Sequence, residues 1–231
     1  MLKLIKLELK KNKFNGSWLG ILIANLCIMG LVALMYFDPE TLENELVFID
    51  FADAFSAIDT FVRATFIIYA SVLIAKFVIE EYKNKTMSLM FSYPISRKKL
   101  IAAKLTIIFT WTFLTITLSN VVISGVLVLV NNYFGYIPGT LEMDTVINYV
   151  LKMLLNTVSA AGLSLIPLFF GMWKKSVPGT IVSAVLIVSI FSSSSGGFSL
   201  YSIIAVPIIL AAIGILVAYL SIRNVDKVDL I

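Results

Sequence analysis

Long apolar runs separated by short polar segments form the dominant pattern of this chain. A helix that crosses a bilayer needs about 20 mostly apolar residues to traverse a hydrocarbon core of roughly 30 Å. Six runs meet or approach this length, at residues 17–37, 60–79, 105–130, 150–172, 177–191 and 200–222. They predict an all-α membrane protein with six transmembrane helices, folded as a single domain over residues 1–231.

The positions of lysine and arginine predict how these spans are oriented. Fifteen loop cations lie in the N-terminal segment and in every second loop, whereas residues 38–59, 131–149 and 192–199 contain none. Cytoplasmic loops carry an excess of these residues. We therefore expect a multi-pass protein of the cell membrane with both termini in the cytoplasm. On this interpretation Asp59 belongs to an acidic outer loop.

The first 16 residues precede the first span and carry a regular pattern of lysines. Lys3, Lys6, Lys10 and Lys13 share an arc of about 80° on a helical wheel. This pattern predicts an amphipathic helix in the headgroup plane over residues 1–16. The alternative is that the lysines only flank the first span. Glu8 falls inside the apolar arc, so it needs a cation from elsewhere, or an aqueous or protein contact.

The composition excludes several classes of function. Hydrophobic residues make up 59% of the chain and charged residues 14%, whereas a soluble domain carries about 25% charged residues. The chain has no histidine and a single cysteine, Cys27, which removes histidine-based catalysis, zinc-type sites and internal disulfides. It also lacks the G-x-x-x-x-G-K-[ST] phosphate loop. We expect no catalytic residue, bound metal or cofactor in this chain, and no nucleic-acid partner.

The third span carries a polar stripe. Its residues, which fall within about 80° of one another at 100° per residue, are Thr106, Thr110, Thr117, Asn120 and Ser124. The stripe either packs helices together or lines a substrate path, and helix packing is favoured.

Other polar and irregular positions lie near the ends of the spans. Arg63 and Lys76 are close enough to the ends of the second span to snorkel into the headgroups, which leaves the middle of every span without charge. Pro167 and Pro207 predict kinks.

Residues 80–104 form the longest cationic loop. Thr86 can cap a short helix that ends before Pro94, with Met87, Met90 and Phe91 on one face. Ser96 can cap the next helix, which continues into the third span. The apolar stripe on this charged loop has two explanations, which the pattern leaves open. It dips into the membrane interface, or it fills a groove on a cytoplasmic partner.

These residues carry a resemblance to a known family. Glu80-Glu81, Lys85-Thr86, the run 87–93, Pro94-Ile95-Ser96-Arg97 and Lys104 occupy the positions of a pattern that recurs in membrane subunits of ABC-2 type exporters. The chain thus resembles the small, six-span bacterial permeases of that family. The departure is Lys85, where the family usually has glycine, so the turn before Thr86 is expected to differ.

The resemblance implies a coupling loop that contacts a separate ABC ATP-binding subunit. The residues it assigns to this contact are Glu80, Glu81, Thr86, Met87, Met90, Phe91, Pro94 and Arg97. It further implies that ATP and Mg²⁺ bind that partner, that a second permease copy or a related permease completes a dimer, and that the chain re-enters the outer leaflet between the fifth and sixth spans.

The sequence is compatible with two classes of function. The first is export of an amphipathic or hydrophobic cargo, such as a peptide antibiotic, a toxin peptide or a drug, as in peptide export and antibiotic self-protection within the resembled family. The alternative is an ion-coupled secondary transporter or channel, or a membrane assembly protein that transports nothing. The absence of charge in the middle of the spans disfavours ion coupling.

Overall fold

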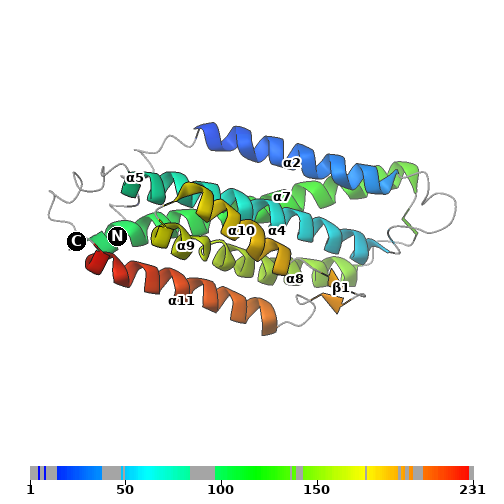
Figure 1. Cartoon of the computed structure of the whole chain (residues 1–231). Helices are drawn as coiled ribbons and strands as arrows, with labels where there is room; N and C mark the ends of the chain where they lie inside the picture. The colour runs from blue at the N-terminus through cyan, green and yellow to red at the C-terminus, as the bar shows by residue number, and fades with distance from the viewer. Residues whose placement is uncertain are drawn as a thin grey trace.

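A computed structural model describes Ile5, Glu8 and residues 15–37, 48, 50–83, 97–135, 137–138, 143–174, 176–191, 194–195, 198–199 and 205–228. These residues form an elongated bundle of helices that lie along a common direction (Figure 1). The elements are α2 (Asn15–Tyr36), α4 (Phe51–Ile74), η1 (Ala75–Ile79), α5 (Glu80–Lys83), α7 (Arg97–Phe134), α8 (Met143–Leu163), α9 (Pro167–Lys174), α10 (Val177–Phe191), β1 (Ser194–Ser195), β2 (Phe198–Ser199) and α11 (Ala205–Val228).

Among the described residues, four helices are long and apolar enough to cross a membrane, and two further apolar helices are shorter. The long ones cover Trp18–Tyr36, Phe51–Ile79, Lys98–Phe134 and Met143–Trp173; the shorter ones cover Val177–Phe191 and Pro207–Ser221. An all-helical membrane fold is therefore found, whereas the count of six spans remains a prediction.

The second predicted span begins earlier than expected. Asp50 is in an extended conformation, and its side chain accepts a hydrogen bond from the Asp53 backbone N–H at 2.8 Å, which caps the first turn of α4. The helix therefore starts at Phe51 and includes Asp59, which the apolar run had placed in an outer loop. The correction has a simple reason: a run of uncharged residues ends at the first charge, whereas a helix ends where its backbone is capped.

α4 lies at the centre of the bundle. It packs against α7, α8 and α10, and its inward face is buried along its whole length. α2 lies at the edge of the bundle (Figure 1). Among the described elements, its main contacts are with α4 and α7. The rings of Trp18 and Trp111 meet edge to face at 5.2 Å, and the Tyr36 hydroxyl donates to Asn131 Oδ1 at 2.8 Å. These two contacts hold α2 to α7 at both ends.

α8 and α11 approach each other most closely through glycines. A Cβ on Gly214 would overlap the Gly162 carbonyl, and a Cβ on Gly162 would lie 2.7 Å from the Ala211 Cα. Small residues allow this kind of backbone approach in membranes, where lipid gives no hydrophobic drive for association. The two glycines explain why α8 and α11 pack closely against each other.

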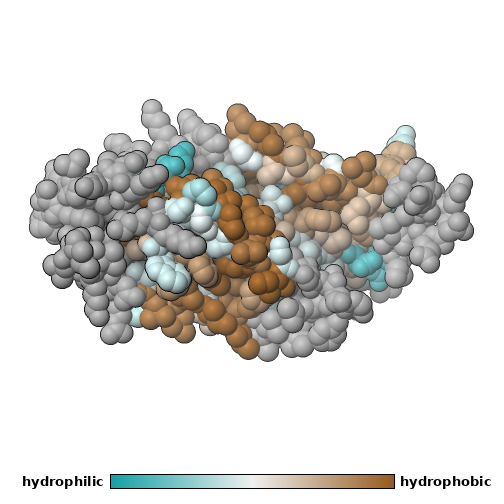
Figure 2. Space-filling model, in the orientation of Figure 1, coloured by the Kyte–Doolittle hydropathy of each residue, from teal (hydrophilic) through white to brown (hydrophobic). Residues whose placement is uncertain are grey.

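The surface has the character expected of a protein embedded in lipid. Large apolar side chains are exposed on all the long helices, including Leu34 of α2 and Leu129 of α7. Figure 2 shows apolar residues across the middle of one face and hydrophilic residues towards its two ends. Such an apolar surface would promote aggregation in water, whereas in a bilayer it contacts lipid.

The prolines act as their positions in the helices dictate. Ser164–Ile166 form a turn and Pro167 is the first residue of α9, so the α-helix is interrupted just before the proline. Hydrogen bonds to carbonyls three residues back continue through the turn, and α8 and α9 together form the apolar stretch Met143–Trp173. Pro207 lies in the first turn of α11, where a missing N–H removes no helical hydrogen bond. It does not interrupt the middle of that helix.

The chain turns back between α10 and α11. Ser194 pairs with Ser199 and Ser195 with Phe198 in a two-stranded antiparallel ladder. α10 has 15 residues, about 22 Å at 1.5 Å per residue, which is shorter than the hydrocarbon core. The re-entrant position of this segment stays a prediction.

Candidate functional site

Glu80 and Glu81, two of the residues assigned to coupling, lie in α5 at one end of the bundle (Figure 1), which we call the inner end after the predicted orientation. Glu80 is exposed and Glu81 half-buried, both in the first turn of α5. Thr86, Met87, Met90, Phe91 and Pro94 lie outside the described residues. Arg97 begins α7, and its side chain also lies outside the described part. The structure therefore describes the two helices that flank the predicted contact surface, α5 and α7, and the surface itself stays a prediction.

A buried lysine joins the two ends of this loop. Lys104 is 2% exposed, and its Nζ lies 2.5 Å from Glu81 Oε2 and 3.8 Å from Glu8 Oε2. The same ammonium donates to the Phe77 carbonyl at 2.8 Å. Lys104 thus links α7 to the end of the second span and to the N-terminal segment. It also answers the expectation that Glu8 needs a cation from elsewhere.

The Phe77 carbonyl belongs to a π-helical turn. η1 spans Ala75–Ile79, and the Glu80 N–H bonds to the Ala75 carbonyl, five residues back. Such turns are rare and frequently occur at functional sites. The π turn and the Lys104 contact occupy the same place, where the second span passes into α5 and the loop.

The polar stripe of the third span does not form one surface. Thr106 and Thr110 are exposed, and their hydroxyls donate to the carbonyls of Ala102 and Thr106, four residues back on α7. Thr117 is half-buried and donates to the Phe113 carbonyl. Asn120 and Ser124 are buried. The stripe divides because the outer half of α7 is covered by α4 and α8, whereas the Thr106 and Thr110 side of its inner half is not.

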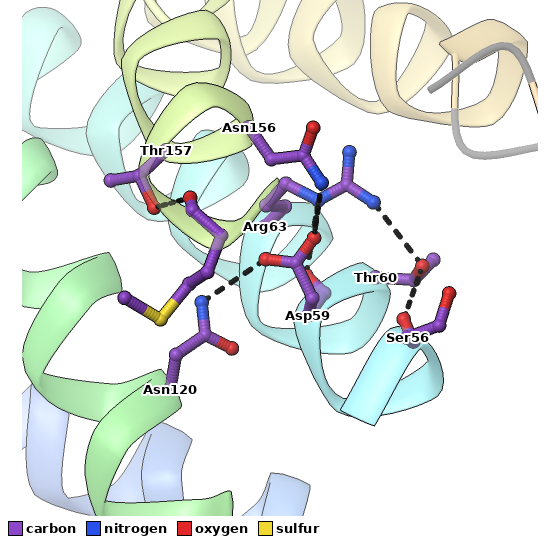
Figure 3. A network of polar contacts seen from close by, with 8 residues as sticks. Ser56, Asp59, Thr60, Arg63, Asn120, Asn156 and Thr157 are labelled. Atoms are coloured by element: carbon purple, nitrogen blue, oxygen red, sulfur yellow. Dashed lines mark hydrogen bonds and ion pairs between the residues drawn. The ribbon is translucent and has the colours of Figure 1, made fainter. Parts of the chain in front are cut away.

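Asn120 belongs to a buried ionic cluster, shown in Figure 3. Asp59 and Arg63 of α4 are 4% and 5% exposed, and Arg63 Nε lies 3.0 Å from Asp59 Oδ2. Asn120 Nδ2 of α7 donates to Asp59 Oδ1 at 3.2 Å, and Asn156 Nδ2 of α8 donates to Asp59 Oδ2 at 2.8 Å. One carboxylate therefore joins three helices. We name these four residues the Asp59 cluster.

The Asp59 cluster corrects two expectations. Arg63 does not snorkel to the headgroups, because its guanidinium is held by Asp59 and by the Thr60 hydroxyl at 3.3 Å. The second span also carries charge well inside it, since Arg63 lies about 18 Å along a 29-residue helix of about 43 Å. Buried charges persist when they are paired and hydrogen-bonded. The sequence did contain a signal for this ion pair, because Asp59 and Arg63 are four residues apart and therefore share one face of a helix.

No group of three or more His, Cys, Asp and Glu side chains able to hold a metal occurs in the described part of the chain. The Asp59 cluster contains one carboxylate, which is already bound by an arginine and two amides. The arrangement therefore suits a polar tie between helices, or a contact for a hydrogen-bonding group, better than metal chemistry.

Comparison with known proteins identifies the family. A family model described as ABC-2 family transporter protein matches residues 4–192. The chain is 46% identical over 228 residues to an uncharacterised protein, YcbO, of Bacillus subtilis (strain 168), covering 99% of this chain and all of the relative. No solved structure matches. The chain therefore belongs to the ABC-2 family and is a permease subunit of an ABC transporter.

Proposed function

We propose that this chain is an exporter permease, which moves an amphipathic or hydrophobic cargo outward with ATP hydrolysed on a separate subunit. The observation that carries the proposal is the ABC-2 match over residues 4–192. The chain has no phosphate loop of its own, so the ATPase is a partner. We further propose that both termini and the loop 80–104 are cytoplasmic.

The ATP-binding subunit docks on the loop between α5 and α7 in this proposal. Met87, Met90 and Phe91 share a face of a predicted short helix within it, and such a face fits a groove on a partner. The ionic contact between Glu81 and Lys104 fixes the two ends of the loop relative to each other. A fixed base supports the proposal, because a push from the ATPase would then reach α4 and α7 together.

The apolar surface supports a hydrophobic component in the cargo. A groove of about 350 Å³ lies between the outer halves of α2 and α7, lined by apolar side chains such as Met29, Val32, Ile123 and Leu127. It suits an acyl chain or the apolar side of a peptide. A peptide antibiotic, a toxin peptide or a drug are the cargoes we propose, carried by a dimer of this permease or by a pair with a related permease.

Ion coupling is the second candidate, and one observation favours it. Asp59 and Arg63 place charge within the second span, which removes an earlier reason against coupled ions. The Asp59 carboxylate is nevertheless fully engaged by Arg63, Asn120 and Asn156. A transport assay separates the two candidates. Transport that needs ATP and continues after an ionophore collapses the ion gradients supports the exporter, whereas transport that stops with the ionophore supports ion coupling.

A glutamate at Met90 tests the coupling proposal. Met90→Glu would place an unpaired charge in the proposed groove, which is costly when buried. We expect the variant to insert normally, to lose its ATPase partner on purification in mild detergent, and to transport nothing. Met143→Glu is the matched control, since Met143 is exposed at the opposite end of the bundle. Normal partner binding and transport by Met90→Glu would show that the ATPase docks elsewhere.

A further inference from the structure

A polar stripe on α8 leads from the outer end of the helix to the Asp59 cluster. Asp144, Asn148, Lys152 and Asn156 recur at every fourth position, and each step turns the stripe by only about 40° around the helix. The first three are exposed, and Asn156 is half-buried where it donates to Asp59. The stripe therefore connects the surface with a buried ion pair.

The neighbouring exposed flank of α8 is apolar. Its residues, each at least 38% exposed, are Met143, Ile147, Val150, Leu151, Leu154, Leu155 and Val158, and Leu155 borders the polar stripe directly. One helix thus presents an apolar flank suited to lipid and, beside it, a polar flank. Because the polar flank ends at Asn156 and Asp59, it lies on the side of α8 that faces α4.

α4 continues the polar flank on its own side. Ser56 is exposed and Thr60 half-buried, and the Thr60 hydroxyl accepts a hydrogen bond from Arg63 Nη2. Figure 3 shows Ser56 and Thr60 on the same helix as Asp59 and Arg63, with Asn156 reaching in from α8. Polar side chains of two helices therefore meet at the Asp59 cluster.

Hydrocarbon is a poor environment for this flank. Lys152 lies about 13 Å along α8 from Met143, and it forms no ion pair with another residue that the structure describes. A lysine can extend its ammonium towards the headgroups, but the short amide of Asn156, about 20 Å along α8, cannot. Polar groups inside spans normally face protein or a water-filled cavity.

Two buried polar atoms near the deep end of the flank would be satisfied by water. Asn120 Oδ1 and Ser159 Oγ are buried and have no hydrogen-bond partner among the described residues. Ser159 lies one turn beyond Asn156 on α8, and Asn120 donates to Asp59 through its other amide atom. Buried polar atoms of this kind are usually satisfied by ordered water.

We propose that a water-filled lane between α4 and α8 runs from the outer surface to the Asp59–Arg63 pair. The position of the lane depends only on the helices described above, and its opening to the outside rests on the orientation proposed for the chain. Its use by cargo rests on the exporter function proposed here: the polar side of an amphipathic cargo, peptide amides in particular, would meet asparagine amides that both donate and accept.

Cysteine accessibility tests the lane. Single cysteines replace Asn148, Lys152 and Ser159 on the polar flank, and Leu151 and Leu154 on the apolar flank, all in a Cys27→Ala background. A membrane-impermeant methanethiosulfonate is added to intact cells that express the chain with its partners. We expect Asn148→Cys and Lys152→Cys to react at least about tenfold faster than Leu151→Cys and Leu154→Cys, with Ser159→Cys between them. Denatured samples must all react equally.

Several outcomes would overturn the lane. Equal rates on the two flanks would show that α8 sits in one environment all round, and protection of Lys152→Cys together with a disulfide between two copies would make this flank a permease interface. A positive result stands even if no ATPase co-purifies, so the two proposals fail separately.

The cargo route has its own readout. ATP-driven movement of a fluorescent amphipathic peptide into inverted vesicles should stop after Asn148→Cys is labelled. Undiminished movement would remove cargo from the lane.

Discussion

Two buried ionic contacts in the described part of the chain are built differently. In the Asp59 cluster, acid and arginine lie four residues apart on α4, and amides from α7 and α8 complete the shell. At the inner end, Lys104 gathers Glu81, Glu8 and the Phe77 carbonyl from separate segments. In the Asp59 cluster, the acid and its counter-ion lie on the same helix. The Lys104 contact instead forms only when α7, α5 and the N-terminal segment come together.

The difference has a physical consequence. The side chains of Asp59 and Arg63 are 4% and 5% exposed, so a missing partner leaves a buried charge that the surrounding protein groups and a few lane waters solvate less well than bulk water does. The Glu81 side chain is 16% exposed, so a stranded carboxylate there can turn to water. The Asp59 cluster therefore ties three helices together within the bundle, and the Lys104 contact ties the two ends of the loop together at the edge of the bundle.

Loss of one charge from the Asp59 cluster should have the largest effect. Arg63→Met leaves the Asp59 carboxylate buried without its cation, and we expect a loss of about 3–5 kcal/mol of unfolding free energy. Titration with a denaturing detergent in mixed micelles measures it. The double variant Asp59→Leu with Arg63→Met removes both charges and should recover much of the loss. A double variant no more stable than Arg63→Met would contradict this account of the cluster.

Removal of the inner-end cation should cost less. Lys104→Met deletes charge-assisted hydrogen bonds to Glu81 and Phe77, and we expect a loss of about 1.5–3 kcal/mol in the same titration. Lys99→Met is the control, since Lys99 is exposed on the same helix, and it should change stability by less than about 0.5 kcal/mol. If Lys104→Met lost as much as Arg63→Met, the two contacts would not differ in access to water.

The smallest effect should come from Glu8. Its Oε2 lies 3.8 Å from Lys104 Nζ, against 2.5 Å for Glu81, so Glu8→Gln should lose only about 0.5–1 kcal/mol. The loss should be smaller in the Lys104→Met background, because the two residues then no longer interact. An equal loss in both backgrounds would mean that Glu8 stabilises the chain through some other partner.

The amino-acid sequence by itself determined the class of the protein and its family. Partition of apolar side chains into lipid is nearly additive along the chain, so runs of residues such as 17–37 and 105–130 identify membrane helices without knowledge of their neighbours. The pattern from Glu80 to Lys104 was likewise local, and the ABC-2 resemblance that it carried is confirmed by the family match.

Only the tertiary structure decided which polar residues are buried together. Asn120 and Asn156 are 61 and 97 positions from Asp59, and no local pattern records that they meet one carboxylate. A scan of single residues treats a charge as the end of a span, and so it moved Asp59 into a loop and Arg63 to the headgroups. Burial of a charge depends on the partners that packing supplies, and those partners come from other helices.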